Sequence, residues 1–188
     1  MGGTGPFGRA LAARLRAAGD DVVLGSRDFE RAAEAAVELG VEGASNEDAV
    51  RGVDLVVLAT KADAAVGTAR SLPLESPLLS VASELRSEEV RSIAERVAEV
   101  VDVAVLAGLH SLAAGKLGAE PPDEDAFVCG DKDARPIALE LAQKLVRGRA
   151  VDAGPLRSAR ALEAMTGVLV GINRRYKAHA GLRVTGLH

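Results

Sequence analysis

The stretch GGTGPFGRALAARL (residues 2–15) decides the fold class, because it joins a glycine-rich turn to the start of a helix. Gly3, Gly5 and Gly8 have the spacing G-x-G-x-x-G, which follows a buried strand and opens a helix in dinucleotide-binding βαβ units. The three glycines then allow, in order, a tight turn, close approach of a pyrophosphate, and close packing of helix on strand. Only two residues precede Gly3 here, so we expect the first strand of the sheet to be truncated.

Apolar strand-like runs and amphipathic helical segments alternate after this turn. Asp28 is a suitable N-cap and Gly40 a suitable C-terminal stop for the second helix. Alternation of this kind predicts an α/β fold with a Rossmann-like, doubly wound parallel sheet. The expected helices cover 9–19, 28–40, 63–72 and 87–101, the last beginning at Ser87, and the expected strands cover 21–25, 54–60, 76–82 and 103–109.

The alternation of strands and helices changes after His110, and we place a boundary between two domains near Gly108. Residues 1–107 form the predicted dinucleotide-binding domain, and 108–188 a small C-terminal α/β domain that completes the substrate site. In the second part we expect helices at 111–119, 133–147 and from Pro155, with strands at 126–130 and 149–154.

Composition excludes several classes of partner. The 188 residues are 48% apolar and 27% charged with a net charge of −4, which indicates a globular protein and disfavours nucleic acid or anionic membrane as a partner. Aromatic residues make up only 2%, so no stacking platform for bases is expected. One cysteine and no apolar run of membrane-spanning length predict a cytoplasmic location.

The glycine turn has two other interpretations. A P-loop has G-x-x-x-x-G followed by Lys and Ser/Thr to hold terminal phosphates and magnesium, but Arg9 and Ala10 stand at those positions, which excludes a kinase or NTPase of this type. A glycine-rich connection without a ligand remains the other alternative.

The end of the next strand favours NADP(H) over NAD(H). NAD enzymes place an Asp or Glu here to bind the ribose hydroxyls, whereas this chain has Ser26 and Arg27, with Arg31 one helical turn later. A hydroxyl and two guanidinium groups suit a 2′-phosphate, which arginine binds in a bidentate manner. The competing interpretation makes Ser26 a cap and leaves both arginines in solvent.

The third apolar run ends at Ala59, Thr60 and Lys61. Ligands of open α/β sheets bind at the carboxyl ends of the strands, so we expect Ala59 and Thr60 to face the nicotinamide half of the cofactor. Lys61 is either a charged contact to substrate or an exposed loop lysine.

Four segments together resemble the NADPH-dependent oxidoreductases that use the deazaflavin coenzyme F420. They are the N-terminal stretch of residues 2–32, FVCGDKD (127–133), VDAGPLRSARALE (151–163) and INRRYKAHAGLRVTGL (172–187). The resemblance implies hydride exchange between NADP(H) and the deazaflavin by a homodimer in which a small C-terminal domain follows a Rossmann domain.

The resemblance also implies site residues. The 2′-phosphate contacts would be Thr4, Ser26, Arg27 and Arg31, while the backbone of Pro6 and Phe7 would meet the pyrophosphate. His110, Ser111 and Leu112 would line the deazaflavin side, with the tail around His179 and Ala180 closing over it. The chain departs from the family pattern at 77–88, which looks shorter, and at Ala113, where a proline is usual.

Hydride transfer between two cofactors needs alignment and exclusion of water rather than a protein nucleophile. No certain catalytic residue is predicted; His110 either orients a cofactor or is a buried histidine without that role. No metal-ligand spacing or catalytic triad is present, and Cys129 reads as an inert core thiol. Two other functions stay open: an NADP-dependent reductase of a small imine or carbonyl, and a non-catalytic NADP-binding sensor.

Overall fold

The computed structural model describes residues 1–84, 89–118 and 120–187, and these form an α/β architecture. The helices are α1 (Pro6–Ala17), α2 (Phe29–Leu39), α3 (Ala62–Arg70), α4 (Ile93–Ala98), α5 (Arg135–Leu145) and α6 (Ala159–Tyr176), with short 3-10 turns η1 (Ala114–Lys116) and η2 (Leu156–Ser158). The strands are β1 (Val23–Ser26), β2 (Glu42–Ser45), β3 (Val56–Leu58), β4 (Leu78–Ser80), β5 (Val105–Gly108), β6 (Ala126–Gly130) and β7 (Ala150–Asp152).

The strands form two sheets. β1 and β2 make a parallel pair, and the other five strands follow the order β3-β4-β5-β6-β7. The pairs β3–β4, β4–β5 and β6–β7 are parallel, but β6 runs antiparallel to β5, with Ala107 opposite Cys129. The expected parallel pairing is thus correct within β3–β5 and within β6–β7. The antiparallel pairing of β5 with β6 joins these two sets of strands into one sheet.

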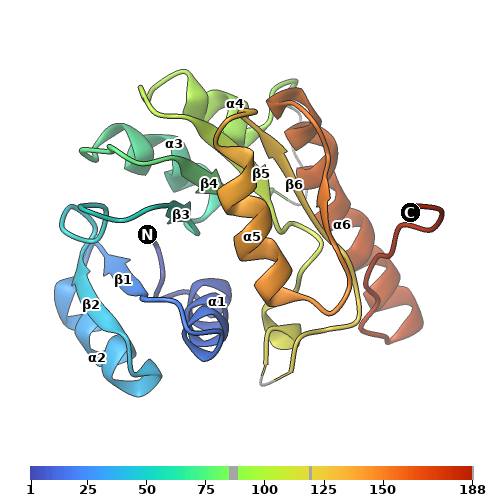
Figure 1. The fold of residues 1–188 in the computed structure, drawn as a ribbon, viewed down its shortest axis with the longest axis horizontal. Coiled ribbons are helices and arrows are strands. Elements are labelled where there is room, and N and C mark those ends of the chain that lie inside the picture. The colour runs from blue at the N-terminus through green and yellow to red at the C-terminus, as the bar shows by residue number, and fades with distance from the viewer. Residues whose placement is uncertain (85–88, 119, 188) are drawn as a thin grey trace.

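Helices cover both faces of the five-stranded sheet (Figure 1). Alternate residues of a strand point to opposite faces, so Leu78 packs with α3, α4 and α6, whereas Leu79 packs with α1 and α5. Leu106 joins the second cluster, and Ala107 the first. This two-sided core of small aliphatic side chains is the doubly wound arrangement predicted from the alternation of elements. No helix of the described residues is both long enough and apolar enough to cross a membrane.

Residues 1–3 join the two sheets where a central strand would run. The amino group of Met1 donates to the Val57 carbonyl at 2.9 Å, and the N–H of Ala59 donates to the Met1 carbonyl at 3.0 Å. On the other side, the N–H of Gly3 donates to the Gly25 carbonyl at 3.2 Å. Three residues therefore bring the carboxyl ends of β1 and β3 together, as Figure 1 shows at the label N.

A cavity of about 720 Å³ lies between the two sheets. Its lining includes Leu24 from β1, Val56 from β3 and Leu11 from α1. The two sheets are thus separated by this cavity, while residues 1–3 contact both of them.

The boundaries of several elements differ from those predicted. Strand β2 was missed, because Glu42–Ser45 has neither an apolar run nor alternation. Helix α4 is shorter than 87–101 and is capped by Ser92, which forms a reciprocal capping box with Glu95; the predicted start at Ser87 lies outside the described residues. Where a helix was expected at 111–119, the described residues contain only the 3-10 turn at Ala114–Lys116.

Other local predictions are confirmed. The Asp28 side chain accepts from the N–H of Arg31 and caps α2, and Gly40 ends that helix with a left-handed φ of 64°. Strand β6 has the predicted bounds, 126–130. The last helix starts slightly later than expected, after η2.

Candidate functional site

The glycine turn leads directly into α1, with Gly5 as its N-cap and Pro6 in the first turn. A Cβ on Gly8 would lie 2.6 Å from the Gly3 Cα, so the helix packs against the turn only if residue 8 is glycine. A Cβ on Gly5 would instead meet only the Gly2 carbonyl oxygen, at 3.6 Å. The protein itself imposes no steric need for glycine at position 5, which is the position where a pyrophosphate would approach the backbone.

The first turn of α1 can hold an anion. The N–H groups of Phe7 and Gly8 have no acceptor inside the helix, because the first turn of any helix lacks them. These groups and the positive end of the helix dipole form a phosphate site of the kind seen in nucleotide-binding folds. Thr4 precedes them in the same turn, half-buried.

The end of β1 presents the predicted cations. Arg27 and Arg31 are exposed, and neither guanidinium has an ion pair or hydrogen bond to another described residue. Ser26 is buried, and its Oγ accepts from the N–H of Asp28 at 3.2 Å, which orders the turn that carries both arginines. Two unpaired like charges beside a hydroxyl are suited to a dianion, which would satisfy both.

Four buried polar atoms without a hydrogen-bond partner among the described residues follow the carboxyl ends of four strands. They are Asn46 Oδ1 after β2, Thr60 Oγ1 after β3, Ser80 Oγ at the end of β4 and His110 Nδ1 after β5. Buried polar groups are normally paired, so a row of unpaired ones at the ligand-binding edge of an α/β sheet indicates a site for a polar ligand. Residues present on this edge therefore fit a dinucleotide.

His110 is held in a defined orientation. Its Nε2 lies 3.1 Å from the Ala82 carbonyl oxygen, which can only accept, so Nε2 carries the proton and Nδ1 is a free acceptor. Its carbonyl oxygen accepts from Thr166 Oγ1 of α6 at 2.9 Å. Leu109 before it has a left-handed φ of 65°, an uncommon backbone state for a side chain of this size. Burial lowers the pKa of His110 to about 4, so the imidazole is neutral at physiological pH.

This pKa makes a prediction for stability. His110 binds a proton below about pH 6.5 in the unfolded chain but only below about pH 4 in the folded chain. Between these values protonation favours the unfolded chain, so the free energy of unfolding is highest above pH 6.5 and falls as the pH is lowered toward 4. Between pH 7 and 4, the free energy of unfolding should fall by about 3 kcal/mol more for the wild type than for His110→Gln. Urea unfolding at several pH values measures this difference; parallel pH curves for the two proteins would contradict it.

Ser111, Leu112 and Ala180, also assigned to the deazaflavin side, lie in two segments. Ser111 and Leu112 are buried in the turn that follows β5, and Ser111 Oγ donates to the Asp125 carbonyl at 3.4 Å. The N–H of Ala180 donates to Asn173 Oδ1 of α6 at 2.6 Å. Helix α6 thus contacts His110 through Thr166 and Ala180 through Asn173, while His179 is exposed.

The sequence offered no signal for Asn46, Ser80, Ala82 and Thr166 as members of this edge, since each is a single residue of common type. Cys129, expected to be an inert core thiol, is buried, and burial raises its pKa to about 12.

Comparison with known proteins gives concordant matches. The family described as NADP oxidoreductase, coenzyme F420-dependent, matches residues 1–84. The F420-dependent NADP reductase of Methanothermobacter thermautotrophicus is 34% identical over 217 residues, covering 100% of this chain and 94% of that protein. Because this chain has only 188 residues, the alignment includes positions that the relative has and this chain lacks.

Solved structures share the fold. A crystal structure of an Arthrobacter sp. FB24 protein, provisionally assigned as an F420-dependent NADP reductase, has a TM-score of 0.82 at 21% identity and covers 96% of both chains. An imine reductase from Aspergillus terreus, in complex with NADPH4 and dibenz[c,e]azepine, has a TM-score of 0.71 at 17% identity. The latter match covers 92% of this chain but 60% of that one.

Proposed function

Because this chain belongs to the family of coenzyme F420-dependent NADP oxidoreductases, we propose that it transfers a hydride between NADP(H) and the deazaflavin coenzyme F420. One observation carries the proposal beyond the family match. Residues 1–3 hold the carboxyl ends of β1 and β3 close together. The arginine pair after β1 and the unpaired polar groups at the carboxyl ends of β3, β4 and β5 therefore lie along the same edge of the fold. An NADP(H) molecule would place its 2′-phosphate at the arginine pair and its nicotinamide toward the unpaired polar groups.

The chain's own residues supply binding and orientation. Arg27 and Arg31 would bind the 2′-phosphate with Ser26 and Thr4 beside them, and the N-terminus of α1 would bind the pyrophosphate. His110, held neutral with Nδ1 free, would accept a hydrogen bond from a bound cofactor. The two cofactors supply the redox chemistry: NADPH and oxidised F420, with one proton from solvent, give NADP⁺ and reduced F420.

The two parts of the chain divide this work in the proposal. Residues 1–107 bind NADP(H), and residues 108–188 complete the deazaflavin side through Ser111, Leu112 and Ala180. A single buried thiol and pyridine-nucleotide chemistry are consistent with a cytoplasmic enzyme.

Mixing the protein with NADPH and oxidised F420 tests the function directly. Loss of deazaflavin absorbance together with NADPH oxidation, in equal amounts, is the expected result. NADPH binding without F420 reduction would contradict the proposal. In that case, turnover of a cyclic imine or small carbonyl would favour the reductase alternative, and tight binding without turnover the sensor.

A homodimer is also proposed, on the outer face of α6. Val168, Ile172 and Tyr176 recur every four residues and are 61%, 37% and 70% exposed, which forms an apolar stripe along one side of the helix. Exposed apolar stripes of this kind commonly mark interfaces.

Light scattering coupled to size exclusion tests this prediction. The wild type should have twice the mass of one 19.3 kDa chain, and Val168→Glu should shift it toward the single-chain mass. Val37→Glu, at an 83% exposed position of α2, is the matched control and should leave the mass unchanged. A wild type of single-chain mass at micromolar concentration would refute the dimer.

A further inference from the structure

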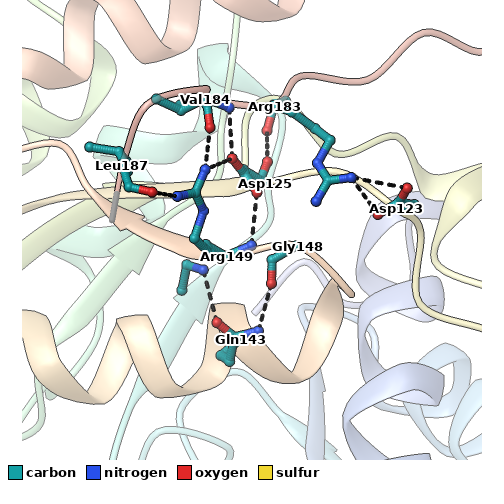
Figure 2. A network of polar contacts seen from close by, with 10 residues as sticks. Asp123, Asp125, Gln143, Gly148, Arg149, Arg183, Val184 and Leu187 are labelled. Atoms are coloured by element: carbon teal, nitrogen blue, oxygen red, sulfur yellow. Dashed lines mark hydrogen bonds and ion pairs between the residues drawn. The ribbon is translucent and has the colours of Figure 1, made fainter.

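The C-terminal tail, residues 178–187, is fastened to the strand start at Asp125 by a group of polar contacts (Figure 2). The N–H of Val184 donates to Asp125 Oδ2 at 2.7 Å, and the N–H of Asp125 donates to the Leu182 carbonyl at 2.7 Å. The guanidinium of Arg149 donates to the carbonyls of Val184 and Leu187 and to Asp125 Oδ2. The tail is therefore held mainly through its backbone N–H and carbonyl groups.

Asp125 is a fully buried carboxylate whose two oxygens both accept hydrogen bonds. The backbone N–H of Arg149 donates to Oδ1 at 2.8 Å, and the backbone N–H of Val184 donates to Oδ2. Burial alone would raise the pKa of Asp125, but the hydrogen bonds from Val184 and Arg149 outweigh it and hold the pKa below its ordinary value. The carboxylate is thus ionised at neutral pH, and each of its oxygens is paired with a donor.

The local backbone is shaped around this carboxylate. A Cβ on Gly148 would lie 2.4 Å from Asp125 Oδ1, so only glycine permits the loop before β7 to pass so closely. Gln143 of α5 fixes that loop, donating to the Gly148 carbonyl at 2.9 Å and accepting from the N–H of Ala150 at 3.0 Å. Arg149 is therefore presented to Asp125 by a fixed loop, as Figure 2 shows.

Asp125 and its neighbour Glu124 also contact residues 110–117, the segment that carries the predicted deazaflavin contacts. Ser111 Oγ donates to the Asp125 carbonyl at 3.4 Å. Lys116 Nζ forms an ion pair with the buried Glu124 at 2.8 Å. Gly181 of the tail lies directly on this pair, since a Cβ there would overlap Glu124 Oε2.

We propose that Asp125 is a positioning residue, which locks the C-terminal tail and the 110–117 segment into one unit and thereby sets the affinity for the deazaflavin without touching it. The proposal rests on the proposed function for its substrate. It assigns no role to Asp125 in binding NADP(H), whose predicted contacts lie in the glycine turn and the first turn of α1, from Ser26 to Arg31, and at Ala59 and Thr60 after β3.

Asp125→Asn is the test variant, because an amide has only one acceptor oxygen and cannot accept from both Val184 and Arg149. Hydrogen exchange should become about tenfold faster or more in both the 181–187 and the 109–117 peptides, with residues 1–20 unchanged. The KM for F420 should rise about tenfold while the Kd for NADPH stays within about twofold. Arg183→Ala is the control. It removes an exposed ion pair between Arg183 of the tail and Asp123, and should behave as wild type.

Two results would overturn the proposal: faster exchange in the tail alone with 109–117 unchanged, or an equal loss of affinity for F420 and NADPH in a folded variant. If Asp125→Asn does not fold, Arg149→Lys gives the same test. This variant keeps the hydrogen bond from the backbone N–H of residue 149 to Asp125 and loses the guanidinium hydrogen bonds to the carbonyls of Val184 and Leu187. Hydrogen exchange is measured without substrate. A wild type that fails to reduce F420 would therefore refute the proposed function, while the exchange data still decide whether Asp125 couples the two segments.

Discussion

Replacing Arg27 by alanine is expected to weaken NADPH binding by about 10- to 100-fold and to leave NADH binding unchanged, because a charge-assisted hydrogen bond contributes about 1.5–3 kcal/mol. Only NADPH carries the 2′-phosphate. The side chain is exposed and unpaired with any other described residue, so its removal should cost little stability. Adding Arg31→Ala should weaken NADPH binding by roughly a further tenfold.

Fluorescence titration of each protein with NADPH and with NADH measures these affinities. Arg175→Ala, at an exposed arginine in the last turn of α6, controls for the general loss of a positive charge and should leave both affinities unchanged. Equal losses for NADPH and NADH in Arg27→Ala would show that the arginine shapes the turn rather than binds the phosphate.

The second large effect is expected at Gly8. Because a Cβ at this position would lie 2.6 Å from the Gly3 backbone, Gly8→Ala must move α1 away from the turn. Strain of this kind costs about 1–3 kcal/mol of folding free energy. A displacement of the helix N-terminus by even ~1 Å would also misplace the N–H groups that face the pyrophosphate, with an expected loss of about 100-fold in turnover with NADPH.

Gly67→Ala is the matched control, since a Cβ on that glycine of α3 meets nothing within 4 Å. It should raise stability by about 1 kcal/mol through helix propensity, with unchanged turnover. Thermal unfolding and steady-state kinetics on both variants separate the two effects. A Gly8→Ala protein with wild-type melting and kinetics would mean that the turn and helix are not packed as described.

The features that could be predicted from sequence are those that depend on neighbouring residues. The glycine turn, the Asp28 cap and the Gly40 stop each require a particular residue type at a fixed distance along the chain, and all appear where expected. The β2 strand could not be predicted, because its residues are small or charged and it is a strand only through its register with β1. The antiparallel step between β5 and β6 likewise depends on contacts between distant residues.

The candidate site divides in the same way. Ser26, Arg27 and Arg31 are close in sequence, and one hydroxyl beside two guanidinium groups was enough to predict a phosphate site. Asn46 and Ser80 become notable only when the order of the strands places them on one edge with Thr60, unpaired and buried. Asp125 and Arg149 lie 24 residues apart, and the tail that they hold is more distant still, so no local pattern identifies their contact.

Isotope tracing tests the central claim, direct hydride exchange between NADP(H) and F420, most directly. The protein is incubated with oxidised F420 and NADPH deuterated at the transferable C4 position of the nicotinamide, and the products are analysed by mass spectrometry. One deuterium in each reduced F420, with none released to water, is the predicted result. Deuterium that stays on the nicotinamide or appears in solvent, or F420 that stays oxidised while NADPH is bound, would contradict the claim.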